Sequence, residues 1–182
     1  MRSLRAPVAM LACLAAACQT DLVPATVENV EDTATMYALS GTAIALPSGF
    51  AIDRRRPERT DTTSQWDFAF NITPQGDAYF YPLAALGLGT SGTPPGFQTT
   101  DRDWDDIDEA PLEGYFTRDS FPLAPGTRLI ARSRVICVQL AFPHFAKIEV
   151  LAIDPVARSV TFRFLANNNC GYQGLEPGLP DT

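Results

Sequence analysis

The sequence predicts a mainly β domain whose strands pair in an antiparallel fashion. Its last third contains four strand-like runs in close succession, at residues 127–132, 135–142, 146–153 and 159–165. Connections this short suit hairpins and are too short for the crossover that parallel strands need. In addition, no amphipathic helical pattern of convincing length occurs along the chain. We therefore expect a single all-β, sandwich-like domain that ends in an antiparallel meander.

The N-terminus is typical of a bacterial lipoprotein signal. Arg2 and Arg5 form a short basic region, residues 8–17 are apolar, and a run of small residues ends at Cys18. We expect residues 1–18 to form this signal and Cys18 to carry the lipid. Lipidation at Cys13, an ordinary secretory peptide and an uncleaved membrane anchor are the alternatives. The expected location is the bacterial cell envelope, with a lipid anchor in the outer membrane and the domain facing the periplasm or the cell surface.

Size and charge narrow the classes of function. No second apolar run approaches the roughly 18 residues that a spanning helix needs. The 164 residues after Cys18 suit one domain with a sizeable core. The net charge of −7 becomes −9 when Arg2 and Arg5 leave with the signal. Nucleic-acid phosphates would repel so acidic a body, so we expect no nucleic-acid partner.

Two cysteines, Cys137 and Cys170, remain after the expected signal. Both lie in the final third, next to strand-like sequence, in a protein expected outside the cytoplasm, where disulfides persist. We therefore predict a disulfide that ties the terminal segment to the sheet. The alternative is a pair of metal ligands, for which the sequence lacks the additional Cys or His partners that zinc needs.

The first part of the mature chain alternates short strands with polar segments. Residues 19–34 are polar and show no steady period, so we expect a flexible tether there and a domain that spans residues 35–182. Residues 36–46 suggest two short strands joined as a hairpin. Residues 52–64 are expected to form a solvated loop, whose four arginines are offset by neighbouring acids.

A half-buried strand is predicted at residues 66–71. Alternation separates an aromatic face from a smaller, more polar one: Trp66, Phe68 and Phe70 on the first, Asp67, Ala69 and Asn71 on the second. A strand of this kind belongs to a sheet with one wet side.

The next strand-like run begins at residue 78. Tyr79 and Tyr81 share one face, Phe80 takes the other, and Pro82 ends the strand or places it at an edge. The glycines and adjacent prolines of residues 87–96 exclude regular structure there.

Four segments form a distinctive series along the chain. They are the Tyr-Ala-Leu-Ser-Gly-Thr run at 37–42, the Trp-Asp-Phe-Ala-Phe-Asn run at 66–71, the Phe-Ala-Lys-Ile run at 145–148 and the aromatic-rich run at 160–164. Together they resemble the HmuY family of surface lipoproteins. Members of that family show similar runs in the same order, after a lipoprotein signal. The resemblance covers most of residues 35–165.

The resemblance implies an all-β domain whose best-known relatives bind haem outside the cell and pass it to an outer-membrane receptor. Those proteins hold the iron between two histidines or two methionines. After Cys18 this chain has one histidine, His144, and one methionine, Met36, which are the candidate haem ligands. Alternatively, His144 is an exposed turn residue and Met36 is a core methionine. The candidate ligand-surface aromatics are Tyr79, Tyr81, Phe97 and Trp104.

One acidic segment offers candidate calcium ligands. Asp101, Asp103 and Asp105 alternate like the start of a calcium loop, but Asp106 stands where that loop needs glycine and Leu112 where it needs glutamate. A calcium site of another shape and a solvated loop are the two interpretations.

The sequence contains no Gly-x-Ser-x-Gly elbow, phosphate loop or zinc motif, so we do not expect an enzyme. The first hypothesis is an HmuY-type binding protein that captures haem or another apolar ligand and docks with an outer-membrane receptor. The second is a structural or interaction lipoprotein of the envelope with no small ligand. A hydrolase that uses carboxylates of residues 101–109 is the third.

Overall fold

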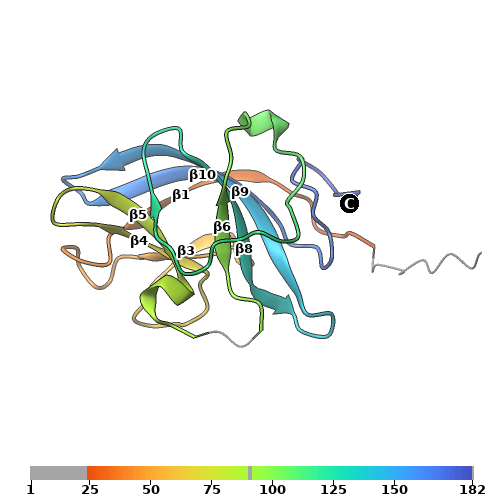
Figure 1. Cartoon of the computed structure of the whole chain (residues 1–182), viewed down its shortest axis with the longest axis horizontal. Coiled ribbons are helices and arrows are strands. Elements are labelled where there is room, and N and C mark those ends of the chain that lie inside the picture. Colours follow the sequence, from red (N-terminus) through yellow and green to blue (C-terminus); the bar gives the residue numbers. More distant parts are fainter. Residues whose placement is uncertain (1–23, 90–91, 182) are drawn as a thin grey trace, which may run out of the picture.

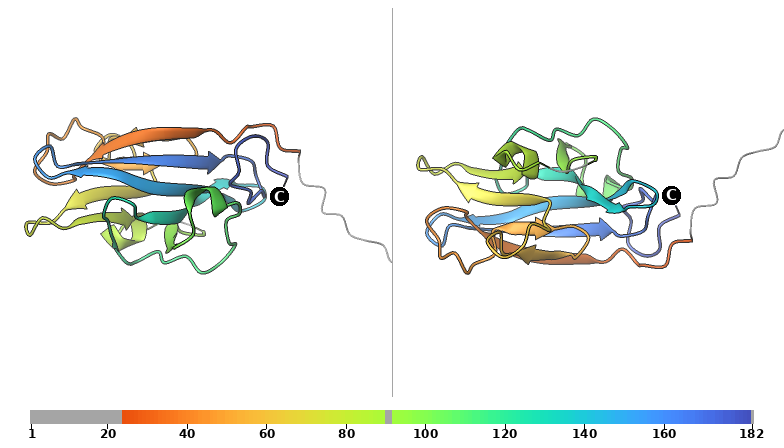
Figure 2. Two further views of the ribbon diagram at one scale, coloured as in Figure 1. Left: turned by 90° about the horizontal axis from the view of Figure 1, so that it is seen from above. Right: turned by 90° about the horizontal axis from the view of Figure 1, so that it is seen from below.

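Two five-stranded antiparallel sheets pack face to face in the computed structural model of the chain (Figures 1 and 2). The structure describes residues 24–89 and 92–181. The predicted all-β, sandwich-like fold is confirmed. The expected lipoprotein signal and Cys18 lie outside the described residues. Within the part that is described, no helix is long and apolar enough to cross a membrane.

The first sheet contains the long strands of the last third. Its strands, in spatial order, are β1 (Glu31–Tyr37), β10 (Ser159–Asn167), β9 (Phe142–Asp154), β8 (Arg128–Cys137) and β6 (Gly96–Thr99). The antiparallel meander is confirmed, but the four predicted runs form three strands. Residues 135–137 of the second run join the first run in β8, because the break between Arg132 and Val135 is a shift in register and not a turn. Residues 138–141 of that run form the turn before β9.

The second sheet is built from shorter strands. Its order is β3 (Arg56–Glu58), β2 (Gly49–Ala51), β4 (Phe68–Ile72), β5 (Ala78–Pro82) and β7 (Phe121–Pro122). Two short 3₁₀ helices, η1 (Leu83–Leu86) and η2 (Trp104–Asp106), interrupt the connecting segments. The hairpin predicted at 36–46 is wrong, because the chain leaves β1 there and crosses to the second sheet. The predicted loop at 52–64 contains β3.

The ordered domain begins earlier than the predicted boundary at residue 35. Strand β1 starts at Glu31, and the buried Asn29 exchanges two backbone hydrogen bonds with Gly178. The Asn29 side chain also donates to the carbonyl oxygens of Gly174 and Glu176. Part of the polar composition of 24–34 therefore reflects hydrogen bonding to the C-terminal tail, and the described chain begins beside that tail (Figure 1). Residues 19–23 of the predicted tether lie outside the described residues.

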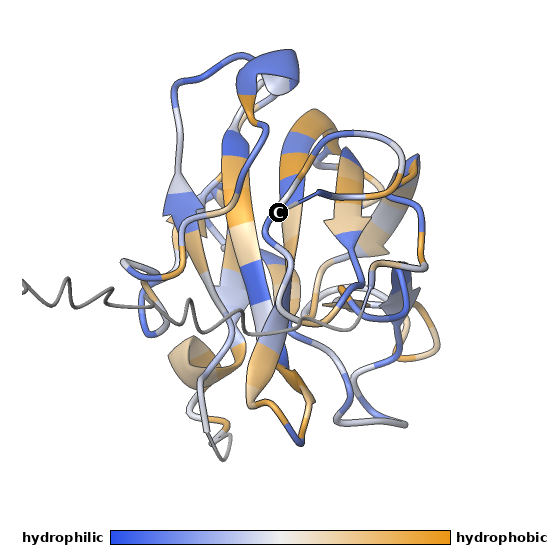
Figure 3. Cartoon of the chain, turned by 90° about the vertical axis from the view of Figure 1, so that its right-hand side faces the viewer, coloured by the Kyte–Doolittle hydropathy of each residue, from blue (hydrophilic) through white to orange (hydrophobic). Residues whose placement is uncertain are grey.

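Phenylalanine rings fill the space between the two sheets. The fully buried ones are Phe50, Phe68, Phe70, Phe80, Phe97, Phe162 and Phe164. Phe68 lies near the middle of this cluster, since its ring centroid is within 6.3 Å of those of Phe50, Phe80, Phe97 and Phe162. Hydrophobic residues follow the strands, whereas the loops around them are largely hydrophilic (Figure 3).

A second, smaller core covers the outer face of the first sheet. Ile130, Phe145 and Leu165 alternate with residues of the inner core and pack with Trp104 and Leu175. Segments that a sequence pattern would leave as loops therefore close this face of the sheet.

Candidate functional site

Asp67 joins the two sheets at one end of the sandwich. Its fully buried carboxylate accepts a hydrogen bond from the backbone N–H of Ile52, which follows β2, at 2.8 Å. From β8 in the other sheet, Arg134 donates its backbone N–H at 2.8 Å and its Nη1 at 2.9 Å. One side chain thus satisfies donors from both layers, which gives the Trp-Asp pair of the sequence a structural role.

Arg134 is held between two carboxylates. Its Nη2 donates to Asp53 Oδ1 at 2.8 Å, on the opposite side from Asp67. Burial raises the pKa of Asp67 to about 6, and the charge of Arg134 and the backbone donors only partly offset this effect. The positive charge of the Arg134 guanidinium is therefore balanced by two carboxylates of the protein.

Trp66 precedes β4 in the sequence, and its side chain does not lie on the aromatic face of that strand. Its indole packs with Ala69 and Leu83 on the outer side of the second sheet, while Phe68 and Phe70 point into the core. The predicted face for Trp66 is wrong because alternation applies only inside a paired strand, and β4 begins at Phe68. Gly49 makes room for the ring, since a Cβ there would lie 2.9 Å from Trp66 Cγ.

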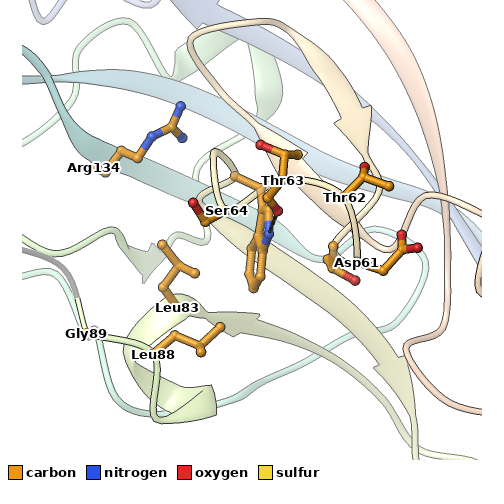
Figure 4. Close-up of a pocket in the computed structure, with 10 residues that line it drawn as sticks. Asp61, Thr62, Thr63, Ser64, Leu83, Leu88, Gly89 and Arg134 are labelled. Atoms are coloured by element: carbon orange, nitrogen blue, oxygen red, sulfur yellow. Dashed lines mark hydrogen bonds between the residues drawn. The ribbon is translucent and has the colours of Figure 1, made fainter.

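A hollow of about 530 Å³ lies over Trp66, within the range of small-molecule sites. The residues that line it are Thr60, Asp61, Thr62, Thr63, Ser64, Trp66, Leu83, Leu88, Gly89 and Arg134. Figure 4 shows the loop of Asp61 to Ser64 on one side and Leu83 with Leu88 on the other, while Arg134 reaches the hollow from β8. A hydrogen bond attaches this loop to the base of the hollow, because Trp66 Nε1 donates to the Thr63 carbonyl oxygen at 3.0 Å.

The lining combines hydroxyl groups with an apolar floor. Four Ser and Thr side chains offer donors and acceptors, and Asp61, which Arg59 holds at 2.7 Å, offers an acceptor. Trp66, Leu83 and Leu88 supply apolar surface. Such a surface suits binding. None of the ten lining residues is a histidine or a cysteine, so the hollow offers neither the usual general base nor a thiol nucleophile.

The structure does not bring the two candidate haem ligands together. Met36 is fully buried in the core and pairs with Val160, whereas Phe145, the neighbour of His144, pairs with Asn167. Seven residues of β10 separate these pairings, which corresponds to about 23 Å of strand. One iron cannot bind both side chains in this arrangement. The hollow over Trp66 does not fit haem either, because no His, Met, Cys or Tyr lines it.

His144 is buried at the start of β9. Its backbone N–H donates to Ser133 Oγ at 2.8 Å, and its Nε2 lies 3.5 Å from Cys137 Sγ. The interpretation of His144 as an exposed turn residue is wrong, because the turn lies earlier, at residues 138–141.

Acid should destabilise the fold through His144, and His144→Gln should remove this effect. Burial and the positive charges of Arg134 and Arg55 lower the pKa of His144 to about 4, although the negative charge of Asp53 acts in the opposite direction. The unfolded chain binds this proton below about pH 6.5, so stability is lost as pH falls from there toward 4. Urea unfolding should show the wild type losing about 2–3 kcal/mol relative to His144→Gln between pH 7 and 4.5.

In the same urea experiment, the stability difference between the wild type and Asp67→Asn should change with pH in the opposite direction. Because the folded pKa of Asp67 is raised, the native state binds that proton first, and the wild type gains stability relative to the variant as pH falls through 6.

A stability difference between wild type and His144→Gln that stays constant over this pH range would contradict the burial of a neutral imidazole.

The predicted ligand-surface aromatics divide into two groups. Tyr79 and Tyr81 are half-buried on the outer face of the second sheet, with ring centroids 6.0 Å apart, and do not line the hollow. Phe97 and Trp104 are core residues and not surface residues. The centroid of the Trp104 ring is 4.3 Å from Arg163 Cζ and 4.8 Å from Lys147 Nζ. Lys147 Nζ also donates to the Trp104 and Ile107 carbonyl oxygens, which explains the buried lysine of the Phe-Ala-Lys-Ile run.

The candidate calcium ligands are exposed and do not converge. Asp103 pairs with Arg128 at 3.1 Å. Asp101, Asp103 and Asp105 form no group with closely placed ligand atoms among the residues that the structure describes. The solvated-loop interpretation fits this segment.

The predicted disulfide between Cys137 and Cys170 is present. It links the end of β8 to the tail that follows β10, as expected.

Comparison of the chain with family models, with curated proteins and with solved structures found no match. The residues that build the hollow were not singled out from the sequence. No local pattern marked them, since Arg134 is one of three arginines in the β8 segment.

Proposed function

We propose that this chain is a lipid-anchored binding protein of the bacterial cell envelope that captures a neutral, hydroxyl-rich small ligand such as a saccharide. The observation that carries the proposal is the hollow over Trp66, with hydroxyl groups on one wall and apolar side chains on the other. The expected lipidation of Cys18 and the resemblance to the HmuY family support the anchored, extracytoplasmic part of the proposal.

The chemistry of the lining favours a saccharide. A sugar ring has hydroxyl groups around its edge and patches of C–H surface on its faces. The hydroxyls of the 60–64 loop would pair with the edge, and the Leu83 and Leu88 side chains would cover a face. Neither contact needs a metal or a charged ligand.

The electrostatics favour a neutral ligand. Asp67 and Asp53 already occupy both Nη atoms of Arg134, so its charge is not free to hold an anion. Asp61 adds a carboxylate at the edge of the hollow. Within the HmuY-type hypothesis we therefore propose capture without iron ligation.

Calorimetric titration with maltose, cellobiose and diacetylchitobiose tests this function. We expect at least one disaccharide to bind the wild type. Leu88→Glu should weaken that binding at least tenfold, or about 1.4 kcal/mol, because it puts a charge into the apolar wall. Leu88 is 45% exposed, so the substitution should leave the fold intact. Val156→Glu, at a 93% exposed position away from the hollow, is the matched control and should bind like the wild type.

Haemin is the comparison ligand in this experiment, and its Soret band should not change when the protein is added. Equal disaccharide binding by Leu88→Glu, or no heat from any of the three sugars, would count against the proposal.

The second candidate function is that of an interaction lipoprotein without a small ligand. The tip of the β8–β9 hairpin favours it, because Val138 and Leu140 are 77% and 48% exposed there and no charged residue occurs between Ile136 and Ala146. Failure of all three sugars would leave this candidate as the better one.

A further inference from the structure

Three side chains with metal-binding atoms meet beside the disulfide. They are Cys137 at the end of β8, His144 near the start of β9 and Cys170 in the tail. Their two Sγ atoms and the imidazole nitrogen all lie within 4.8 Å of one another. Cys137 and His144 are buried, and in this structure the two sulfurs form the disulfide.

We propose that reduction of this disulfide creates a binding site for a soft divalent ion of the Zn²⁺ type, with Cys137, Cys170 and His144 as ligands. Zinc prefers thiolate and imidazole ligands in a tetrahedral arrangement. Its usual bond lengths place a sulfur and a nitrogen ligand about 3.5 Å apart in a tetrahedron. His144 Nε2 and Cys137 Sγ are 3.5 Å apart, so this pair already has the required separation.

The remaining adjustment is local. The two sulfurs must separate from bonding distance to the spacing of two ligands on one ion. Cys170 is only partly buried and lies in a turn, so its backbone is less constrained than that of Cys137 inside the sheet. His144 stays in place because Ser133 holds its backbone N–H.

Both cysteines border a hollow at the surface of the domain. Cys137 and Cys170 line a hollow of about 270 Å³ whose other walls include Val27, Leu140 and Asn169. A reductant and an ion can enter through it. Three protein ligands leave the fourth tetrahedral position for water, as in zinc sites that keep an open position.

The charges of the ligands suit a divalent ion. A neutral imidazole and two thiolates are the forms of these side chains that bind metal. A dithiol reductant gives two electrons and two protons to the disulfide and becomes a disulfide itself. The two resulting thiols lose their protons as they bind the ion, and two thiolates balance its double charge.

The disulfide and the ion would thus be alternative clamps at one place. Each of them links the tail at Cys170 to strand β8, so the tail remains attached in both redox states. This inference does not depend on the proposed function, because its residues do not line the hollow over Trp66.

Cobalt titration of the reduced chain tests the site. The chain from Gln19 is reduced without oxygen by a phosphine, which is then removed, and Co²⁺ is added. We expect one equivalent to give the thiolate-to-cobalt charge-transfer band and the intense visible bands of a tetrahedral site, and Zn²⁺ to abolish both. His144→Gln should weaken Co²⁺ binding by more than about 100-fold, since loss of even a group that only hydrogen-bonds to a metal ligand costs 10- to 100-fold. The unreduced wild type is the control and should give no such bands.

Two results would overturn the proposal. One is a reduced, folded wild type, judged by near-ultraviolet circular dichroism, that gives no cobalt bands. The other is a spectrum of equal intensity and affinity from His144→Gln. If reduction unfolds the chain, Zn²⁺ should restore the circular dichroism signal of the wild type and not that of His144→Gln, and failure to restore it would also overturn the site.

Discussion

Asp67→Ala is expected to lower the free energy of unfolding by about 3–5 kcal/mol, the usual cost of removing one partner of a buried ion pair. The substitution leaves the backbone N–H groups of Ile52 and Arg134 without their acceptor. It also removes one of the two carboxylates that hold Arg134 of β8 at this end of the sandwich, where only Asp53 remains. Urea unfolding at pH 7 measures the loss.

Asp61→Ala is the matched control, because Asp61 forms its ion pair with Arg59 at the surface. It should cost far less than Asp67→Ala, because exposed ion pairs contribute little to stability. Equal losses in the two variants would contradict the role of Asp67 as the link between the sheets. Asp67→Asn should fall between the two, since the amide keeps the volume and one acceptor oxygen.

Phe68→Ala should destabilise the fold by about 3–5 kcal/mol, as expected for removal of a buried aromatic side chain. Phe68 contacts rings from both sheets, with Phe50 and Phe80 on its own side and Phe97 and Phe162 on the other. The cavity would open at the centre of the core, where backbone pairing on both sides limits collapse. Thermal and urea unfolding both measure this loss.

Phe116→Ala serves as the comparison, because Phe116 is 57% exposed and lies at the rim of the same aromatic group, 6.4 Å from Phe121. It should cost less than about 1 kcal/mol, because most of its surface is already in water. A Phe68→Ala protein as stable as Phe116→Ala would contradict the central position of Phe68 in the core.

Much of the fold could be predicted from local patterns. Alternation placed Phe68 and Phe70 in the core and separated Tyr79 and Tyr81 from Phe80, because each of these residues lies inside a paired strand. The same logic failed for Trp66, two positions before β4. It does not apply to Trp104, which was expected at a ligand surface and is buried. Trp104 lies in a short 3₁₀ helix that packs on the outer face of a sheet, and no periodic pattern reports such packing.

The site depends on contacts that local patterns cannot contain. Asp67 and Arg134 are 67 positions apart, and only the packing of two sheets brings them together. The hydroxyl wall comes from a loop with no steady period, held by a bond from Trp66 to a backbone oxygen. The disulfide was accessible to sequence reasoning because only two cysteines follow the expected signal, whereas the approach of His144 to them required the register of β8 and β9.

The proposed ligand site in the hollow over Trp66 is tested most directly by a map of amide chemical shifts in the ¹⁵N-labelled chain during titration with the same three disaccharides. We predict saturable shifts grouped at residues 60–64, Leu83, Leu88 and Arg134, and no comparable shifts at residues 138–141. A hollow in which no amide moved at saturating sugar, or a spectrum with the largest shifts at the β8–β9 hairpin tip, would contradict binding at this site.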